Sequence, residues 1–195
     1  MQDTLTELMS SRICHDLISP VGAIGNGLDL ITELSGTTPE LDLVSQSAFT
    51  AQAKLKFFRI AFGASGDRLM SGAEAQRVAQ EMFSAGRMQI SFTESWGDRQ
   101  RGLVKLLYLL LLCTESSLPR GGEMICTPTI SGWEISVSGA PVKAPEELWN
   151  HVLHGSASGP LTAKNIQFSL ARQSLTDQEI SVTGTFTEDH LRLVF

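Results

Sequence analysis

His15 and Asp16 place an imidazole beside a carboxylate, and this pair is the part of the sequence best suited to chemistry. At about 100° of rotation per residue, His15 lies about 200° from Ile13 and Leu17, so it points away from the apolar side of a predicted helix. An exposed neutral imidazole nitrogen is a nucleophile, and a carboxylate on the opposite N–H can fix its tautomer and favour a charged adduct. The pair therefore fits phosphoryl transfer through His15, with Asp16 orienting the ring.

The residues that share the outward face with His15 would form a docking surface. Pro20 has no N–H, so the carbonyl of Asp16 loses its helical partner and the helix can bend beside the histidine. The glycines between positions 22 and 27 each cost up to about 1 kcal/mol inside a helix, which indicates that another surface approaches this backbone closely. We therefore expect a small, partly apolar partner-binding face made of Arg12, Ile18, Ser19, Gly22 and Asn26. Spacing alone also allows a plainer interpretation, because an exposed His-Asp pair on a helix is usually only a solvated pair.

Two apolar patterns predict the helices that carry this face. Apolar residues at helical spacing run through 5–34, and a second series with steps of three and four runs through 41–62. Between them, Ser35-Gly36-Thr37-Thr38-Pro39 supplies a helix stop, an N-cap and a proline suited to a first turn. We therefore expect an antiparallel helical hairpin, residues 1–66, that closes at the linker Gly63-Ala64-Ser65-Gly66.

A single hairpin would leave much of both apolar seams in water, at a cost of roughly 25 cal/mol per Å² of apolar area. Pairing with a second copy into a dimeric four-helix bundle removes that exposure most simply. The alternative is that the rest of the chain covers the seams. We expect the dimer.

Residues 67–195 predict a second domain of mixed structure. A capping-box pattern, Ser71 to Glu74, begins a short helix that ends before Gly86. Further helices are expected near 102–117, 145–154 and 161–175, with strands at 88–93, 124–130, 133–137, 179–185 and 191–195. The whole chain is therefore predicted to be α+β, with a helical hairpin followed by an α/β sandwich of helices on a mixed sheet.

Composition argues against several classes of partner. The net charge is −6, and the 15 Lys and Arg residues form no basic stripe, so we expect no nucleic acid partner. The most apolar run, 103–113, contains Lys105 and is too short to cross a bilayer, so we expect no membrane span. The 3 cysteines are widely spaced and lack C-x-x-C pairing, which fits a reducing cytoplasm. His151 and His154 have no nearby third ligand, so we expect no metal site.

The segment around His15 also resembles a known family. His15-Asp16-Leu17-Ile18-Ser19-Pro20 resembles the H-box of sensor histidine kinases. The longer run, Ile13-Cys14-His15-Asp16-Leu17-Ile18-Ser19-Pro20-Val21-Gly22-Ala23-Ile24, is similar to the ChpT-like histidine phosphotransferases. That family has the same layout of a hairpin followed by an α+β domain. The resemblance implies a homodimer whose histidine takes a phosphoryl group from a receiver-domain aspartate and passes it to another. The implied partners are receiver domains of a hybrid histidine kinase and of response regulators, with Mg²⁺ held by the receiver.

The second domain resembles the ATP-binding domain of histidine kinases, but the nucleotide-binding residues are largely missing. Counting back from Pro119-Arg120-Gly121-Gly122, the place of the metal-binding asparagine falls on Cys113, whose neutral thiol is a poor ligand for Mg²⁺. Ser138-Gly139-Ala140-Pro141-Val142 stands where the family's aspartate and two glycines would bind adenine, and Ser158-Gly159-Pro160 is only faintly similar to its phosphate loop. The resemblance therefore implies a degenerate ATPase-like domain with no ATP binding and no cofactor of its own.

These observations predict a histidine phosphotransferase of a two-component phosphorelay, a phosphocarrier with His15 and Asp16 at its centre. Two alternatives stay open. One is an active soluble histidine kinase that binds ATP, and the other is an adaptor that binds receivers or kinases without carrying phosphate.

Overall fold

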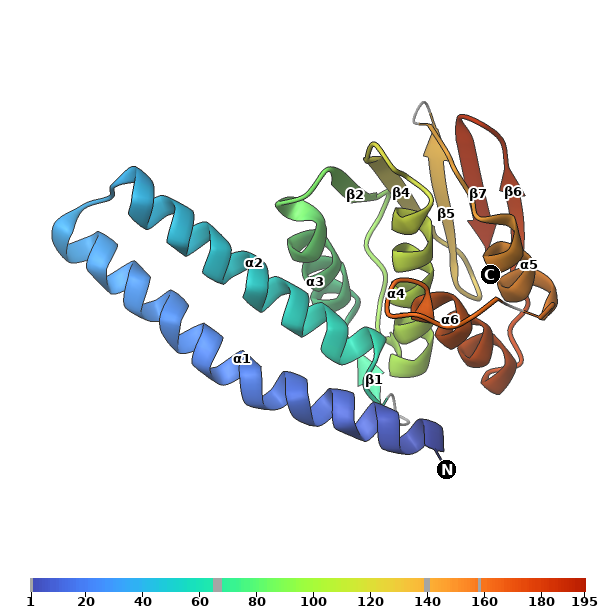
Figure 1. Cartoon of the computed structure of the whole chain (residues 1–195), viewed down its shortest axis with the longest axis horizontal. Helices are drawn as coiled ribbons and strands as arrows, with labels where there is room; N and C mark the ends of the chain where they lie inside the picture. Colours follow the sequence, from blue (N-terminus) through green and yellow to red (C-terminus); the bar gives the residue numbers. More distant parts are fainter. Residues whose placement is uncertain (1, 65–67, 139–140, 158) are drawn as a thin grey trace. The chain divides into compact units, whose positions relative to one another are not determined.

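The computed structural model describes residues 2–64, 68–138, 141–157 and 159–195. They form two compact units, Met1–Ala64 and Ser65–Phe195 (Figure 1). The predicted domain boundary after Gly66, together with Ser65 and Gly66 of the predicted linker, lies outside the described residues.

The first unit is a pair of helices, α1 (Gln2–Ser35) and α2 (Pro39–Ala61) (Figure 1). Gly36 ends the first helix with a positive φ of 77°, a conformation that glycine adopts without steric cost. Thr38 caps the second helix, because its side-chain oxygen accepts a hydrogen bond from the Leu41 N–H at 3.2 Å. Pro39 begins that helix, where its missing N–H costs nothing. The predicted end of the first helix, N-cap of the second helix and first-turn proline are therefore all present.

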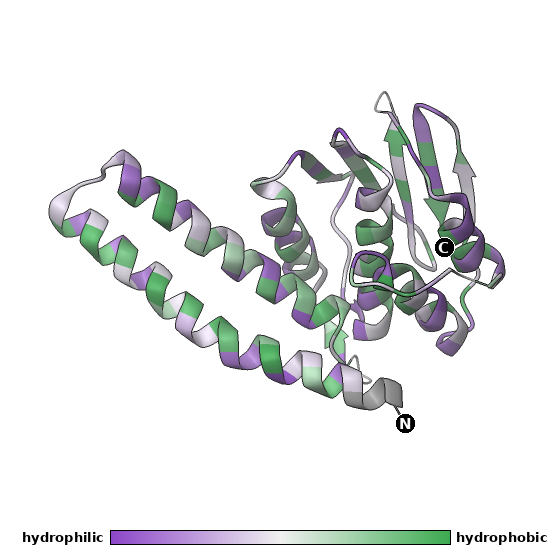
Figure 2. Cartoon of the chain, viewed as in Figure 1, coloured by the Kyte–Doolittle hydropathy of each residue, from purple (hydrophilic) through white to green (hydrophobic). Residues whose placement is uncertain are grey.

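The two helices leave a stripe of apolar side chains in contact with water. Cys14 of α1 is buried. Ile13, Leu17, Ile24 and Ile31, which repeat at helical spacing along α1, are between 45% and 55% exposed. Figure 2 shows apolar residues along both helices. We call these four residues the α1 apolar stripe.

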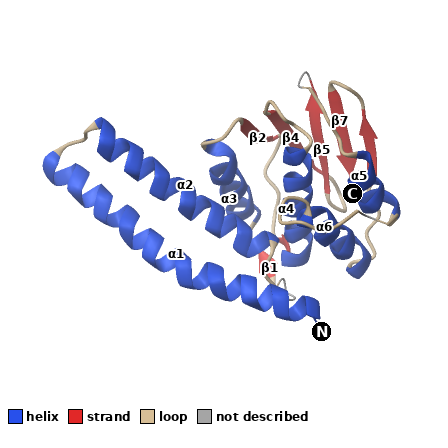
Figure 3. Ribbon diagram, viewed as in Figure 1, coloured by secondary structure: helices blue, strands red, loops and turns tan. Residues whose placement is uncertain are grey.

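The second unit packs helices against a five-stranded mixed sheet (Figure 3). The strand order is β2 (Met88–Phe92), β4 (Gly122–Pro128), β5 (Trp133–Ser138), β7 (His190–Val194) and β6 (Thr183–Phe186), and only β2 and β4 are parallel among the described pairs. The helices are α3 (Gly72–Ser84), α4 (Arg101–Ser116), α5 (Glu146–His154) and α6 (Ile166–Asp177). The predicted α+β class and mixed sheet are confirmed.

Helix α4 forms the centre of this unit. Every residue from Val104 to Thr114 is buried, which explains a helix that is apolar around its whole circumference. Alternate residues of the strands, such as Ile135 and Leu193, are buried on the same face of the sheet. The Tyr108 hydroxyl donates a hydrogen bond to the Ala75 carbonyl at 2.7 Å and joins α4 to α3.

Some predicted boundaries were wrong for identifiable reasons. Helix α6 begins at Ile166 instead of near residue 161, because the Asn165 side chain accepts a hydrogen bond from the Thr162 N–H at 2.6 Å and holds a turn there. Strand β6 begins at Thr183 instead of 179, since Glu179 has a positive φ of 55° just after that helix. Ser71 lies at the N-cap of α3 but makes no side-chain cap bond, so the predicted capping box does not form. The short pair β1 (Leu69–Met70) and β3 (Arg99–Gln100) was not predicted.

No described helix combines the length and the apolar character that crossing a membrane requires.

Candidate active site

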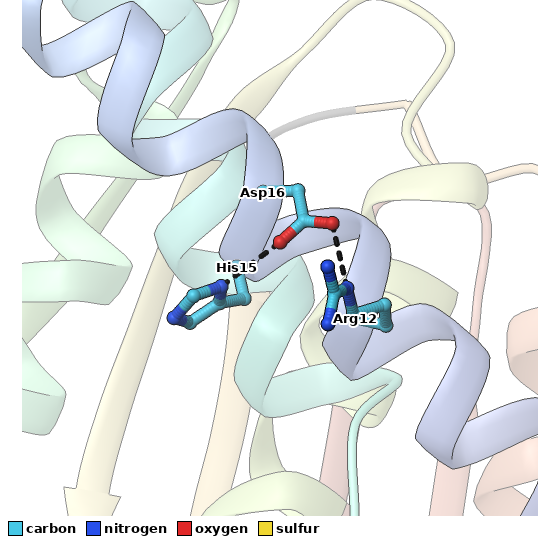
Figure 4. Close-up of polar contacts among 3 residues, drawn as sticks. All are labelled: Arg12, His15 and Asp16. Atoms are coloured by element: carbon cyan, nitrogen blue, oxygen red, sulfur yellow. Dashed lines mark hydrogen bonds and ion pairs between the residues drawn. The ribbon is translucent and has the colours of Figure 1, made fainter.

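Three side chains on neighbouring turns of α1 share one polar network (Figure 4). The Arg12 Nε donates a hydrogen bond to Asp16 Oδ2 at 2.6 Å, and His15 Nδ1 lies 3.0 Å from Asp16 Oδ1. Arg12 and Asp16 are four residues apart, a spacing that puts two side chains on the same side of a helix. One carboxylate therefore connects a guanidinium to an imidazole.

The charge on Asp16 decides which ring nitrogen of His15 carries the proton. The hydrogen bond with His15, followed by the one from Arg12, holds the pKa of the Asp16 carboxyl below its usual value. The carboxylate is therefore ionised at neutral pH, and an ionised carboxylate can only accept hydrogen bonds. The neutral His15 ring must then donate from Nδ1, which leaves the lone pair on Nε2. A ring nitrogen with a free lone pair can act as a nucleophile.

The Nε2 atom is also accessible. The His15 side chain is 78% exposed and the Asp16 side chain 47% exposed. Cys14, one residue earlier, is buried, and this burial raises the pKa of its thiol. The imidazole is therefore exposed on α1, whereas the neighbouring thiol is buried.

The predicted partner-binding face is only partly outward. Arg12, Ser19 and Asn26 are exposed, as expected. Ile18 and Gly22 are half-buried, and a side chain at position 22 would begin 3.1 Å from the Nε2 of Gln52 on α2. Their predicted placement on the freely outward surface is therefore corrected, and at Gly22 the second helix lies close by.

Helix α2 adds two polar residues that the spacing along α1 did not indicate. Gln52 approaches Gly22, and Arg59 lies close enough to Cys14 for its charge to lower the thiol pKa against the larger effect of burial. Neither residue has a sequence signature, because their position depends on how the two helices pair. A partner that reaches His15 would approach α2 as well as α1.

Cys113, where the sequence predicts the loss of a metal-binding asparagine, lies in the buried part of α4. Cys113 is completely buried, and burial raises the pKa of its thiol well above the usual value. At the end of α4 the Trp149 indole donates to Ser117 Oγ at 2.9 Å, and the Gln167 amide donates to Ser116 Oγ at 2.8 Å. Gly139, Ala140 and Ser158, which the sequence singled out, lie outside the described residues. Among the residues that are described, no three His, Cys, Asp or Glu side chains gather as a metal-binding group.

Comparison with known proteins now identifies the family. A family model described as the histidine phosphotransferase C-terminal domain matches residues 72–190. The chain is 34% identical to the protein phosphotransferase ChpT of Brucella abortus (strain 2308), over 93% of this chain and 90% of that protein. This chain belongs to the ChpT-like histidine phosphotransferases. A solved structure of a bacterial phosphotransferase is similar, with a TM-score of 0.69 and 28% identity over 94% of this chain and 91% of that one.

Membership of the ChpT-like family confirms the resemblance seen around His15 and the assignment to histidine phosphotransferases. The family model covers most of the second unit, whereas the similarity to ChpT also includes most of the helical pair. A phosphotransferase of a phosphorelay acts between signalling proteins.

Proposed function

We propose that this ChpT-like chain is a phosphocarrier and that His15 carries the phosphoryl group. The observation that supports this most directly is the network of Arg12, Asp16 and His15, which leaves Nε2 unprotonated on an exposed ring. A nucleophile, an orienting carboxylate and an open approach are what phosphoryl transfer through histidine requires.

The donor in this proposal is an aspartyl phosphate of a receiver domain. The Nε2 lone pair attacks phosphorus, an N–P bond forms, and the P–O bond to the aspartate breaks. The bonding electrons leave with the receiver carboxylate, and the His15 ring becomes a phosphorylated cation that Asp16 stabilises by charge. The return reaction passes the same group to the aspartate of another receiver. The Mg²⁺ that neutralises the phosphoryl oxygens belongs to the receiver, because hard cations prefer clusters of acidic oxygens.

A carrier that does not use ATP fits the second unit. Cys113 is a buried neutral thiol at the place where the family of kinases has an oxygen ligand, and both serines that follow it are engaged by α5 and α6. Phosphorylated receivers then remain as the source of the phosphoryl group. We therefore prefer the phosphocarrier to the ATP-dependent kinase.

The α1 apolar stripe supports a homodimer in this proposal. Its four residues lie on the side of the helix opposite to His15, so a second copy could cover them without covering the imidazole. Removing such a stripe from water is favourable by roughly 25 cal/mol per Å² of apolar area. We propose a four-helix bundle with an exposed His15 on each copy.

The proposed partners are the receiver domains of a hybrid histidine kinase and of response regulators. Receivers would dock over Arg12, Ser19 and Asn26, with Ile18 and Gly22 at the edge nearer α2. All three cysteines are free and buried, in keeping with a proposed location in the reducing cytoplasm.

A phosphorylated receiver carrying labelled phosphate tests the proposal. Incubated with this protein, it should transfer the label to the chain in an acid-labile, alkali-stable form, and His15→Ala should accept none. His15 is exposed, so the variant should keep the circular dichroism and mass of the unmodified protein. Asp16→Asn should slow transfer without abolishing it, since it keeps the size of the side chain but loses the charge.

Label on the His15→Ala variant equal to that on the unmodified protein would place the carrier elsewhere. A second outcome, no label on either protein while both still bind the receiver, would support the adaptor alternative.

A further inference from the structure

The described contact of Arg12 in this network is with Asp16, which in turn contacts His15. The Arg12 Nε donates to Asp16 Oδ2 at 2.6 Å, while the other oxygen of the same carboxylate faces His15 Nδ1 at 3.0 Å (Figure 4). The two contacts use the two oxygens separately. The orientation of the carboxylate is therefore defined from both sides.

Without these two contacts, the orientation of the Asp16 carboxylate would not be fixed. Its side chain is 47% exposed, and a terminal carboxylate torsion is broad, so water could hold it in other orientations. Without the acceptor at Nδ1, a neutral imidazole exchanges its proton between the two ring nitrogens. The tautomer with the proton on Nε2 has no lone pair there and cannot attack phosphorus.

We propose that Arg12 is a positioning residue for phosphoryl transfer, which holds Asp16 Oδ2 so that Oδ1 stays on the His15 Nδ1–H and Nε2 keeps its lone pair. This inference rests on the proposed role of His15 as the carrier. Arg12 would then position Asp16 of its own chain, in addition to contacting a receiver as its exposed position leads us to expect.

Stability is a poor explanation for this ion pair. The Arg12 side chain is 77% exposed, and exposed pairs four residues apart on a helix contribute little to folding. An exposed pair of that kind would be tolerated anywhere along the helix, but this one shares its carboxylate with the imidazole. Losing Arg12 should therefore change the chemistry of His15 and leave the thermal unfolding temperature unchanged.

The test compares Arg12→Ala, Arg12→Gln and Arg12→Lys in the full-length protein, with Arg120→Gln as a matched control that removes one exposed arginine charge from the second unit. The first measurement is the pair of ¹⁵N chemical shifts of the His15 ring at alkaline pH, where the imidazole is neutral. The second is the rate of phosphorylation by phosphoramidate, a small donor that needs no docking surface.

We expect Arg12→Ala to move the Nε2 shift toward that of a protonated nitrogen and to slow phosphorylation by about tenfold. This is the low end of the loss caused in metal sites by removing the hydrogen-bond partner that orients a metal-binding histidine. Arg12→Gln should behave like Arg12→Ala or fall between it and the unmodified protein. Arg12→Lys should restore part of both readouts, because it returns the charge without the same donor geometry. Arg120→Gln should match the unmodified protein.

Unchanged ring shifts and an unchanged phosphoramidate rate in Arg12→Ala would overturn the inference, and slower transfer from a receiver alone would then assign Arg12 to docking. Failure of His15 as the carrier would look different, because His15→Ala would still accept label from a receiver.

Discussion

In the proposed mechanism Asp16 orients His15 only while its carboxyl is ionised, so the lowered pKa of Asp16 sets the pH range of this effect. The hydrogen bond with His15, and next the one from Arg12, favour the ionised carboxylate in the folded chain. A lowered pKa means that this interaction is fully present above the unfolded-state value and is lost only as the pH falls through the lower folded-state value. Protonation of Asp16 therefore does not interfere with the tautomer of His15 at neutral or mildly acidic pH.

Ser19 offers a cleaner test of docking at the residue scale than the half-buried Gly22. It is exposed and follows His15 by four residues, so it lies one turn away on the same side of α1. In Ser19→Arg a long charged side chain would have to be desolvated beneath a docked receiver, and the desolvation of an ion in a protein contact costs several kcal/mol. Transfer from a receiver should fall about tenfold or more, whereas phosphorylation by phosphoramidate should not change.

Glu33→Arg is the control, because Glu33 is exposed and on the same side of α1 as His15 but lies on the order of 27 Å from it at 1.5 Å per residue. It should transfer at the unmodified rate. Equal receiver kinetics for the two variants would show that receivers do not dock along this face.

The pairing of His15 with Asp16 could be predicted from sequence because it depends on adjacent positions in one helix. The exposure of His15 followed from helical rotation for the same reason. The closeness of Gly22 to Gln52 could not be predicted, since it depends on the rotation of α2 against α1. The bond from Arg12 depends on a side-chain rotamer, which the spacing allows but does not select.

At the scale of elements, the helices were predictable because apolar periodicity acts over many residues, and local hydrogen bonds explain where their ends differ. The turn held by Asn165 delays α6, and a left-handed Glu179 delays β6. Strands β1 and β3 have two residues each, too few to produce an alternating pattern. Gly25 and Gly27 have open space where a side chain would begin, so no described atom of this chain accounts for either glycine.

The α1 apolar stripe leads to a prediction about assembly. Ile24 is 55% exposed in one copy, so Ile24→Glu should leave the helical pair folded but put a charge into the proposed dimer interface. We expect light scattering to give the mass of a monomer at micromolar concentration, with an unchanged helical content by circular dichroism.

Ala23→Glu is the adjacent control. Ala23 is also exposed, but it lies about 100° around the helix from Ile24 and off the stripe, so this variant should remain a dimer. If the unmodified protein is itself a monomer at tens of micromolar, the proposed bundle does not form.

In the second unit, the polar residues at the end of α4 form hydrogen bonds with neighbouring helices of the same unit. Cys113 lies within the run of buried residues on α4, and Ser116 and Ser117 accept hydrogen bonds from α6 and α5. Opening this end of α4 for a nucleotide would break those bonds and leave buried polar groups without partners, at about 1–3 kcal/mol each. The packing at this end of α4 is therefore consistent with the proposal that the phosphoryl group comes from another protein.

Mg-ATP should accordingly fail to bind the full-length protein at millimolar concentration. A ligand present at a hundred times its dissociation constant stabilises the folded state by about 2.7 kcal/mol, so even a modest affinity would raise the thermal unfolding temperature visibly. We expect the unfolding temperature with Mg-ATP to equal that with Mg²⁺ and an unrelated polyphosphate at the same ionic strength. Titration calorimetry should give only the heat of dilution. A saturable heat together with a specific rise in unfolding temperature would instead favour an ATP-dependent kinase, and label from ATP appearing on His15 would establish it.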